Sequence, residues 1–325
     1  MADDSDMRSR QQQARQQKMM NAHKKQMQMM AWAKQQQSIQ PQAKNMGSSF
    51  SSTMGRAYDD LPIMEPNDII FVPDSAASQA SRESFESACQ HGPLSTVQSI
   101  VSTESHRSAP IKTPTPSFLH HGLIIALTAG NIDVAHYLLS AGAPIVRQTP
   151  TTILSAPPDQ QIPLFDLLTH HGWTPNTPGY YGEVLLPKII TNLPLLRWFL
   201  AHGANPNLGA QRDNRDRNGA SETDSCAALQ AAAGSCDVET VRMLLDAGAE
   251  IRNGVPLHCA AGVCPAGENP HVDAVTPSRE FDVGRIPVMA LLVERGADVN
   301  QAEESRHMVA RYAIVHAVMA GAVER

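Results

Sequence analysis

Apolar residues recur at helical spacing along much of the chain, and a glycine closes each run. In DVETVRMLLDAGAE, the side chains of Val238, Val241, Leu244 and Leu245 fall on one face of a helix. Gly248 follows at the position where a helix C-terminus commonly adopts positive φ. The pattern therefore predicts an amphipathic helix that buries this face and ends at Gly248.

Four other segments repeat the same arrangement of a leucine-rich run followed by glycine. They are LLSAGAPI from Leu138, LLTHHGWTPN from Leu167, FLAHGANPN from Phe199 and LLVERGADVN from Leu291. The terminating glycines are Gly142, Gly172, Gly203, Gly248 and Gly296, with separations of 30, 31, 45 and 48 residues. Such a period predicts an internal structural repeat in which neighbouring units stack to bury their apolar faces.

Each late repeat begins with an alanine-rich stretch, which predicts a first helix ahead of the leucine-rich second one. Between repeats, Asn253 and Gly254 form the pair that favours a two-residue hairpin turn. Pro256 then stands where a first helix would begin, a position that needs no backbone N–H donor.

These segments resemble ankyrin repeats. VPLHCAAG (255–262) and LLVERGADVN are similar to the T-P-L-H-x-A-A and L-L-x-x-G-A-D-V-N signatures of that family, and weaker copies occupy 121–143 and 227–249. The resemblance covers residues 84–325. It implies an all-α repeat solenoid of stacked helix-turn-helix units with hairpin loops, in about six to seven repeats of which some are degenerate.

Several repeats depart from the pattern. Pro157 and Pro158 interrupt the first helix of one repeat, and Pro187 replaces an alanine in the next. FESACQHGPLSTVQSIV (85–101) lacks the closing glycine and is interpreted as an N-terminal cap. A last first-helix copy starts at Tyr312, so we expect the final repeat to be incomplete, as in a truncated array.

Two insertions account for the longer spacings. Residues 208–224, which include RDNRDRNG, fall on the hairpin side between two repeats, whereas 263–283 fall between the two helices of one repeat. Both are rich in glycine, proline or charge, and we predict mobile loops.

The region before the repeats has a different composition. Residues 1–45 form a Gln/Met/Lys-rich, low-complexity tail, interpreted either as a partner helix, coiled-coil strand or calmodulin-like target, or as a partly helical solvated tail. Residues 46–83 are predicted to be a disordered linker. Within it, DDLPIMEPNDIIFVPDS is either a short docking motif or a strand that caps the first repeat.

Composition narrows the cellular setting. No run of about 18 apolar residues is present, and MADDSD lacks the basic and apolar regions of a secretory signal. The five cysteines are odd in number and scattered, which favours reduced thiols in the cytoplasm or nucleus over a secreted disulfide scaffold.

Charge is distributed unevenly. Residues 1–45 carry eight Lys/Arg and three Asp, a net +5, in a chain whose net charge is −6, so the rest carries −11. An acidic body disfavours binding of nucleic acid by the repeats. In the tail, Arg8, Arg10 and Arg15 are too sparse for a DNA-reading helix of the zipper type.

Catalytic chemistry has no candidate constellation, so we expect no enzyme and no cofactor. The nucleophile-elbow, dinucleotide, P-loop and zincin motifs are all missing from the sequence. Cys236 replaces a small residue between two helices and is interpreted as buried. His258, Cys259, Cys264 and His271 are metal-type ligands, but their spacing matches no common zinc module. His171 and His202 occupy matching places in adjacent repeats and could be neighbours.

The resemblance implies protein binding through hairpin tips and the exposed side of the first helices. The corresponding tip positions are Leu119, His120, Thr149, Pro150, Tyr180, Tyr181, Ser225, Cys226, Asn253 and Gly254. Tyr180 and Tyr181 are the strongest candidates because tyrosine is enriched at interface hot spots. The alternative is that they pack against Trp173. Trp198, at a second-helix position, is interpreted as core.

The preferred hypothesis is therefore a non-enzymatic protein–protein interaction module or scaffold. The first alternative is a nuclear or transcriptional regulator that uses the Gln-rich basic tail. The second is a metalloenzyme built around His258 and Cys264. A further possible partner is a second copy of the same chain, bound through the N-terminal tail.

Overall fold

The computed structural model describes residues 76–107, 116–303 and 311–325, with side chains from residue 82 onward except 104–107. Within these ranges the chain is helical, and its β-structure is limited to an isolated antiparallel bridge between Gly209 and Glu222. The expectations for the tail, and for the linker up to residue 75, lie outside the described residues.

The helices form two series that alternate along the chain. The first helices are α2 (Ala76–His91), α4 (Pro116–Ala129), α6 (Thr149–Thr152) with the 3-10 turn η3 (Ile153–Ser155), α8 (Leu186–Ile189), α10 (Ala227–Ser235), α12 (Pro256–Ala261) and α14 (Ala313–Met319). The second helices are α3 (Leu94–Arg107), α5 (Ile132–Ser140), α7 (Pro158–His170), α9 (Leu193–Ala201), α11 (Val238–Asp246) and α13 (Arg279–Glu294).

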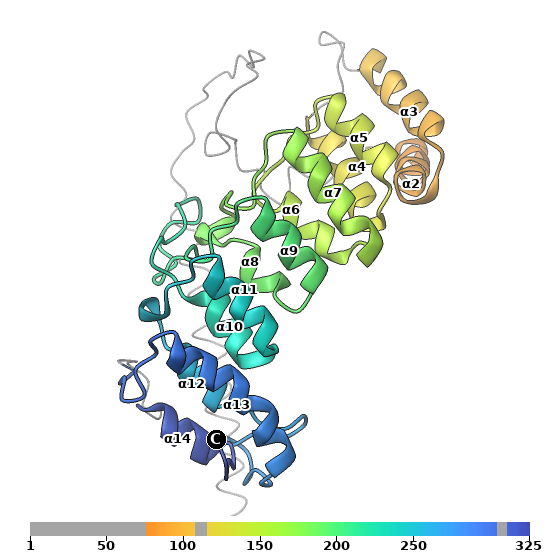
Figure 1. Ribbon diagram of the computed structural model, residues 1–325. Coiled ribbons are helices and arrows are strands. Elements are labelled where there is room, and N and C mark those ends of the chain that lie inside the picture. The colour runs from red at the N-terminus through yellow and green to blue at the C-terminus, as the bar shows by residue number, and fades with distance from the viewer. Residues whose placement is uncertain (1–75, 108–115, 304–310) are drawn as a thin grey trace, which may run out of the picture. The chain divides into compact units, whose positions relative to one another are not determined.

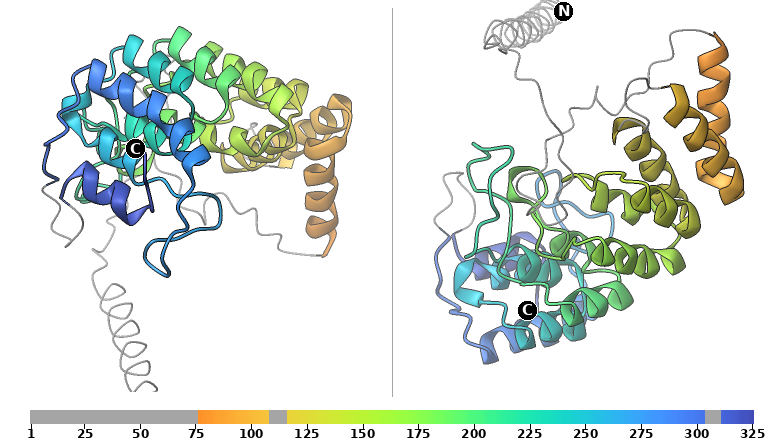
Figure 2. Two further views of the ribbon diagram at one scale, coloured as in Figure 1. Left: turned by 60° about the horizontal axis from the view of Figure 1, so that its bottom comes forward. Right: turned by 90° about the horizontal axis from the view of Figure 1, so that it is seen from above.

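Each series forms its own row of stacked helices. In the first row α2 packs on α4, α8 on α10, α10 on α12 and α12 on α14; in the second, α3 packs on α5, α5 on α7, α7 on α9 and α11 on α13 (Figures 1 and 2). Helices that belong to one repeat, such as α4 and α5, also pack against each other. The expected all-α repeat solenoid is confirmed.

The second helices end at the residues that the sequence pattern indicates, but α13 begins at Arg279, inside the segment 263–283 that was predicted to be a loop. Side chains of Asn131, Asn192 and Asp237 cap α5, α9 and α11 by accepting a backbone N–H from the residue three positions later. The predicted terminating glycines all adopt positive φ: 98° at Gly142, 89° at Gly172, 79° at Gly203, 92° at Gly248 and 100° at Gly296. At Gly248 a Cβ would meet nothing within 4 Å, so the backbone conformation, and not crowding, requires glycine.

The core runs continuously between the two rows. In α11, Val241, Leu244 and Leu245 are buried and Val238 packs partly buried against them, as the spacing predicts. Aromatic side chains concentrate at α7 and α9, where the Phe165 ring lies 5.3 Å from Trp173 and 5.0 Å from Phe199, between centroids.

Trp198 lies at the edge of this aromatic cluster and is only partly buried. Its ring packs against the core, while its Nε1 donates a hydrogen bond to Asp166 Oδ1 at 2.8 Å. Trp198 therefore belongs to the margin of the core, because its polar nitrogen needs a partner.

The expected Asn253-Gly254 hairpin turn is wrong. Residues Ile251–Asn253 form the 3-10 turn η5, and Gly254 is extended. A Cβ on Gly254 would lie 2.5 Å from Cys226 Cβ. Glycine is therefore needed here because a side chain would prevent the two repeats from packing this closely. Pro256 opens α12 as expected.

Proline also shapes the degenerate repeats. The first helix of one repeat stops early, as predicted, because η3 ends at Ser155, Pro157 is the N-cap of α7 and Pro158 is its first residue. Pro187 lies in the first turn of the short helix α8, where a missing N–H costs no helical hydrogen bond. The repeats therefore keep their helix pairs with shortened first helices.

Candidate partner-binding surface

Four of the expected tip residues lie inside the protein. Leu119 and His120 belong to α4 and are 2% and 0% exposed, and Thr149, which with Pro150 opens α6, is 0% exposed. Pro150 is also buried. These four side chains form part of the interior between repeats, so their assignment to exposed tips is wrong.

The reason is a buried hydrogen-bonded link between two repeats. His120 Nε2 lies 2.9 Å from Thr149 Oγ1, and Thr149 Oγ1 also accepts the backbone N–H of Val146 at 2.9 Å. Burial, with a smaller effect of His121, lowers the pKa of His120 to about 4. The ring is therefore neutral near pH 7, and the pair joins α4 to the start of α6.

Tyr180 and Tyr181 occupy the 3-10 turn η4 (Tyr180–Gly182) between α7 and α8, on the hairpin side of the repeats. Tyr181 has φ 55° and ψ 29°, a left-handed conformation that a bulky residue rarely adopts. The residue is nonetheless 39% exposed. The backbone thus holds an aromatic side chain toward solvent in a strained conformation.

The insertion at 208–224 supplies the groups that hold this turn. The Tyr181 N–H donates to the Arg217 carbonyl, and the Gln211 N–H donates to the Tyr181 carbonyl, both at 2.8 Å. Ser221 Oγ donates to the Gly182 carbonyl at 2.5 Å, and the Arg217 guanidinium lies 4.3 Å from the centroid of the Tyr180 ring. The expected free loop is instead folded back onto η4.

Arg147, which precedes α6, contacts both the turn, one repeat further along the chain, and the insertion, two repeats further along. Its Nη1 donates to the carbonyls of Pro178 and Gly179 at 3.2 and 2.9 Å, and its Nη2 donates to the carbonyl of Asn218 at 2.5 Å. A further, longer bond of 3.4 Å reaches the Gly219 carbonyl. The planar guanidinium suits this task because it presents several donors in fixed directions.

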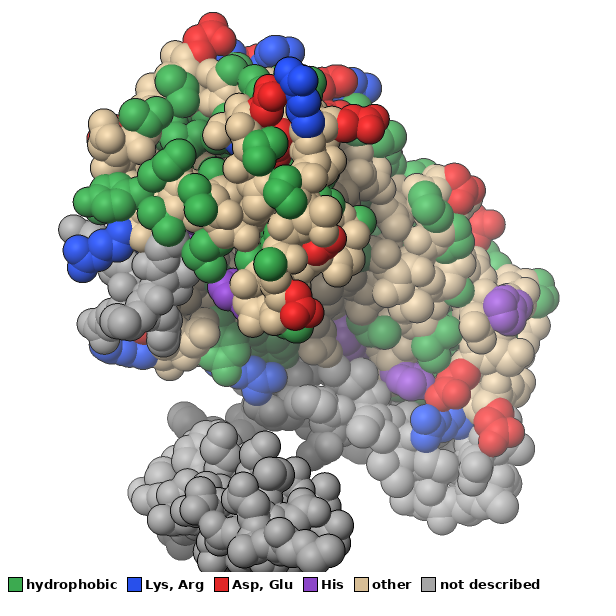
Figure 3. Space-filling model, turned by 90° about the horizontal axis from the view of Figure 1, so that it is seen from below, with side chains coloured by type: hydrophobic (Ala, Val, Ile, Leu, Met, Phe, Trp, Pro, Cys, Tyr) green, Lys and Arg blue, Asp and Glu red, His purple; other side chains and the backbone are tan. Residues whose placement is uncertain are grey.

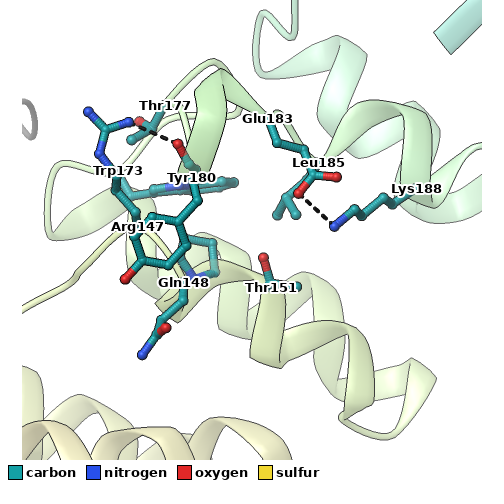
Figure 4. Close-up of a pocket in the computed structure, with 11 residues that line it drawn as sticks. Arg147, Gln148, Thr151, Trp173, Thr177, Tyr180, Glu183, Leu185 and Lys188 are labelled. Atoms are coloured by element: carbon teal, nitrogen blue, oxygen red, sulfur yellow. Dashed lines mark hydrogen bonds and ion pairs between the residues drawn. The ribbon is translucent and has the colours of Figure 1, made fainter. Parts of the chain in front are cut away.

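A pocket of about 220 Å³ opens beside this turn. Figure 4 shows Arg147, Trp173 and Tyr180 on one side of the pocket and Glu183 and Lys188 on the other. Lys188 Nζ pairs with Glu183 Oε2 at 2.9 Å. The pocket is also lined by buried apolar side chains, namely those of Trp173, Leu185 and Pro150. Tyr180 and Trp173 share this pocket, whereas Tyr181 stands outside it.

The remaining tip candidates lie near the hairpin side but are less accessible. Ser225 is half-buried, and its Oγ accepts the N–H of Ala227 at 3.2 Å. Cys226 is buried, and burial raises the pKa of its thiol to about 12. Asn253 and Gly254 are half-buried in the turn before α12. A role of Ser225 or Asn253 in binding stays a prediction.

The histidines and cysteines named as candidate ligands contact different partners. His171 lies beside His136, with ring centroids 6.4 Å apart, while His202 stacks on Trp198 at 3.9 Å, so the two adjacent-repeat histidines face different partners. His258 Nε2 lies 3.1 Å from the Arg311 carbonyl. All five cysteines are free thiols.

Within residues 76–107, 116–303 and 311–325, no group of three or more His, Cys, Asp or Glu side chains is arranged to hold a metal ion. Among the described helices, none combines the length and the apolar composition needed to cross a bilayer.

Sequence reasoning missed Arg147, Glu183 and Lys188 as residues of this surface. Arg147 lies 71 residues from Asn218, and nothing in the sequence indicates that the two are joined. Lys188 and Glu183 carry no motif; only their positions on either side of the start of α8 place them at the pocket.

Comparisons with known proteins find similarity at the level of structure. No model of a protein family matches the chain, and no curated protein sequence matches it. Among solved structures, the ankyrin repeat domain of Bcl-3, described as a unique member of the IκB protein family, is similar, with a TM-score of 0.41 and 17% identity. That match covers 66% of this chain and 87% of the other.

Proposed function

We propose that this repeat stack is a non-enzymatic interaction module that binds a partner protein through the turn η4 and the adjoining pocket. The chain resembles ankyrin repeats in its sequence signatures and in its paired, stacked helices, and such repeats present surfaces for partners. The observation that carries the proposal is Tyr181. Strained backbone that exposes an aromatic ring is retained only where the surroundings enforce it, and it points to function.

The surface has the features of a hot spot. Tyr180 and Tyr181 provide rigid apolar area with polar hydroxyl groups. The pocket beside them is lined by buried apolar side chains and by the charged side chains of Arg147, Lys188 and Glu183. We infer that the partner inserts one apolar side chain of an exposed segment into this pocket, while Tyr181 contacts the flanking backbone.

The arrangement is also pre-organised. The hydrogen bonds from Arg147, and those between Tyr181 and the insertion, fix η4 before any partner arrives. Less ordering entropy is then lost on binding, which favours affinity. With five free thiols, we propose that the protein acts in a reducing compartment, the cytosol or the nucleus.

The test uses the full chain as bait, followed by identification of a retained protein and reconstitution of the complex from purified components. Tyr180→Ala and Tyr181→Ala should each weaken this defined complex by about 30-fold or more, as expected for a hot-spot residue. Tyr312→Ala is the matched control because Tyr312 is exposed to a similar degree, 43% against 39% for Tyr181. Equal affinity for all three variants would place the interface elsewhere.

A further inference from the structure

One segment ahead of the repeats is acidic and apolar at the same time. Residues 59–74, which precede the described ranges, read DDLPIMEPNDIIFVPD, with five Asp or Glu, no Lys or Arg, and seven Leu, Ile, Met, Phe or Val. The apolar run 69–72 stands between Asp68 and Asp74. We refer to residues 59–74 as the acidic segment. Its composition suits a site where positive charge lies beside apolar side chains.

The pocket beside η4, here called the η4 pocket, has the complementary chemistry. Arg147 and Lys188 bring two positive charges to its lining, and Glu183 brings one negative charge. Tyr180 and the buried Trp173 line the pocket beside these charges. The lining is therefore net positive and partly aromatic.

The rest of the stack is acidic, so it repels the segment. Residues 46–58 contribute +1 and the acidic segment −5 to the −11 of residues 46–325, which leaves −7 on residues 75–325. Basic and acidic side chains of the described residues are scattered over the face seen in Figure 3, without one large patch of basic ones. A net positive pocket is therefore a local site of attraction on a repulsive body.

Lys188 can exchange its partner at this pocket. Its side chain and that of Glu183 are 39% and 47% exposed, and an ion pair with this exposure contributes little to stability. A carboxylate of the acidic segment can therefore replace Glu183 on Lys188 at low cost.

The acidic segment leads into α2, and α2 runs parallel to α4. The Phe85 ring stacks on Phe118, near the start of α4, at 4.3 Å between centroids. Beyond the end of α4, Asn131 Nδ2 donates to the Cys89 carbonyl at 3.3 Å. The start of α2 therefore lies on the same side of the stack as the start of α4.

The next first helix keeps this direction. His120, in the second turn of α4, lies 2.9 Å from Thr149 at the start of α6. At the other end, a Cβ on Gly130 would lie 3.1 Å from Pro157, which follows η3. The first turn of α6 also lines the η4 pocket. The acidic segment thus joins the stack on the side where this pocket opens.

The distance to the pocket is within reach of the segment. Neighbouring helices pack about 8–10 Å apart, so three steps along the first row, from α2 to α8, span about 30 Å. The 17 residues 59–75 extend to roughly 55 Å at most. Because the segment is tethered to α2, its effective concentration at the pocket is high.

We propose that the acidic segment occupies the η4 pocket of its own chain, with the run 69–72 against Tyr180 and a carboxylate on Lys188. A partner that binds the same surface must first displace the segment, so the chain regulates its own binding. This regulatory role rests on the proposed function of the η4 surface, whereas the docking of the segment does not.

The test is photocrosslinking of the full chain with p-benzoylphenylalanine in place of Tyr181, beside the pocket, and mapping of the products by mass spectrometry. Crosslinks to residues 59–74 should form with at least 10-fold higher yield than from Tyr312→p-benzoylphenylalanine, a label of similar exposure in the last described repeat. Added salt should lower the yield, because it screens the charges.

Charge reversal tests the contact with Lys188. Lys188→Glu should lower the crosslink yield from position 181 at least 5-fold, because it opposes the acidic segment. Arg252→Glu is the matched control. Arg252 is also an exposed cation paired with a carboxylate, that of Glu250, in a pocket that lies further along the stack and has no aromatic lining. This variant should leave the yield unchanged.

Three outcomes overturn the docking. Without crosslinks from position 181 to residues 59–74, the segment lies elsewhere, for example against the first repeat. Equal yields from the labels at 181 and 312 would show contact without a site. Crosslinks between isotope-labelled and unlabelled chains in a mixture would assign the segment to the pocket of a second copy. Circular dichroism of each variant confirms that the fold is retained.

Affinity for the partner identified above separates the regulatory role from the proposed function. Phe71→Ser removes the aromatic ring of the acidic segment and should tighten the partner complex at least 3-fold. Unchanged affinity, with the crosslinks lost, would overturn the regulatory role. Failure of the proposed function looks different, since the crosslinks would form while Tyr180→Ala left partner affinity unchanged.

Discussion

The carboxylate of Asp282 and the guanidinium of Arg325 form a buried ion pair, with 2.6 Å between Oδ1 and Nε and both side chains 1% exposed. Asp282 Oδ2 also accepts the N–H groups of Val323 and Glu324 at 2.7 and 3.1 Å. Burial by itself would raise the pKa of Asp282, but these two N–H groups and Arg325 outweigh it and lower that pKa. The pair fastens the segment after α14 to α13.

Removal of one partner should therefore be costly. Arg325→Ala leaves the Asp282 carboxylate buried without its counter-charge, and we expect the free energy of unfolding to fall by about 3–5 kcal/mol. Urea denaturation followed by circular dichroism measures this change. Arg279→Ala serves as the control, because the Arg279–Glu324 pair is exposed and should contribute no more than about 1 kcal/mol. Similar losses in the free energy of unfolding for both variants would mean that the buried pair contributes no more to stability than the exposed pair.

The His120–Thr149 link predicts a pH dependence. The pKa of His120 is lowered from 6.5 to about 4 in the folded protein, so the unfolded chain binds the proton more readily. Above pH 6.5 this group therefore does not change the free energy of unfolding. As the pH falls from 6.5 toward 4, the free energy of unfolding decreases by about 3 kcal/mol in total.

Denaturant titrations at several pH values measure that slope. His120→Gln should flatten it, since the titrating group is removed, although the variant itself is less stable at pH 7. Thr149→Ser retains a hydroxyl group for His120 and should keep the slope of the unsubstituted protein. A slope that persists in His120→Gln would assign the acid sensitivity to other groups.

The backbone conformation of Tyr181 predicts that removing its side chain weakens partner binding without lowering the stability of the fold. Glycine adopts φ 55° without a steric penalty, so Tyr181→Gly should leave the free energy of unfolding unchanged or raise it by about 1 kcal/mol. Tyr181→Val should lower it by at least about 1 kcal/mol, because a β-branched residue fits this conformation poorly. Thermal melts rank the three proteins. If Tyr181→Gly proved clearly less stable, the ring would have to be important for folding.

The Arg147 contacts predict that the insertion opens when they are removed. Charge-assisted hydrogen bonds each contribute about 1.5–3 kcal/mol, so Arg147→Ala should increase the open population of 208–224 more than tenfold. Trypsin cleavage after Arg212, Arg215 or Arg217 reports that population. Arg242→Ala, at an exposed position on α11, is the control. Equal cleavage rates in Arg147→Ala and the control would show that the other contacts of the insertion are sufficient.

Local patterns predicted the repeated element well. Helix periodicity placed Val241 and Leu244 in the core, and the run-closing glycines marked helix ends because positive φ is a local requirement. Tip residues were misplaced for a physical reason. Whether Leu119 or Thr149 is exposed to a partner depends on how neighbouring repeats pack against each other. The local sequence pattern does not determine this packing.

Contacts between distant residues were beyond sequence reasoning. Asp282 and Arg325 are 43 residues apart, and each looks like an ordinary surface charge in the sequence. The insertion at 208–224 has the composition of a flexible loop, yet its backbone finds partners in Arg147 and η4 that only the folded stack brings near. Such pairs arise from tertiary geometry, which overrides local composition.

The hydrogen bonds that Arg147 makes to distant residues affect how the stack unfolds. Repeat arrays usually behave as a chain of units coupled only to their immediate neighbours. Arg147 precedes α6, whereas Asn218 lies between α9 and α10, so this one side chain couples the ends of a block of two complete repeats. Amide protons of α7, α8 and α9 should therefore exchange with solvent through a shared opening event, as a single cooperative block within an otherwise sequentially melting array.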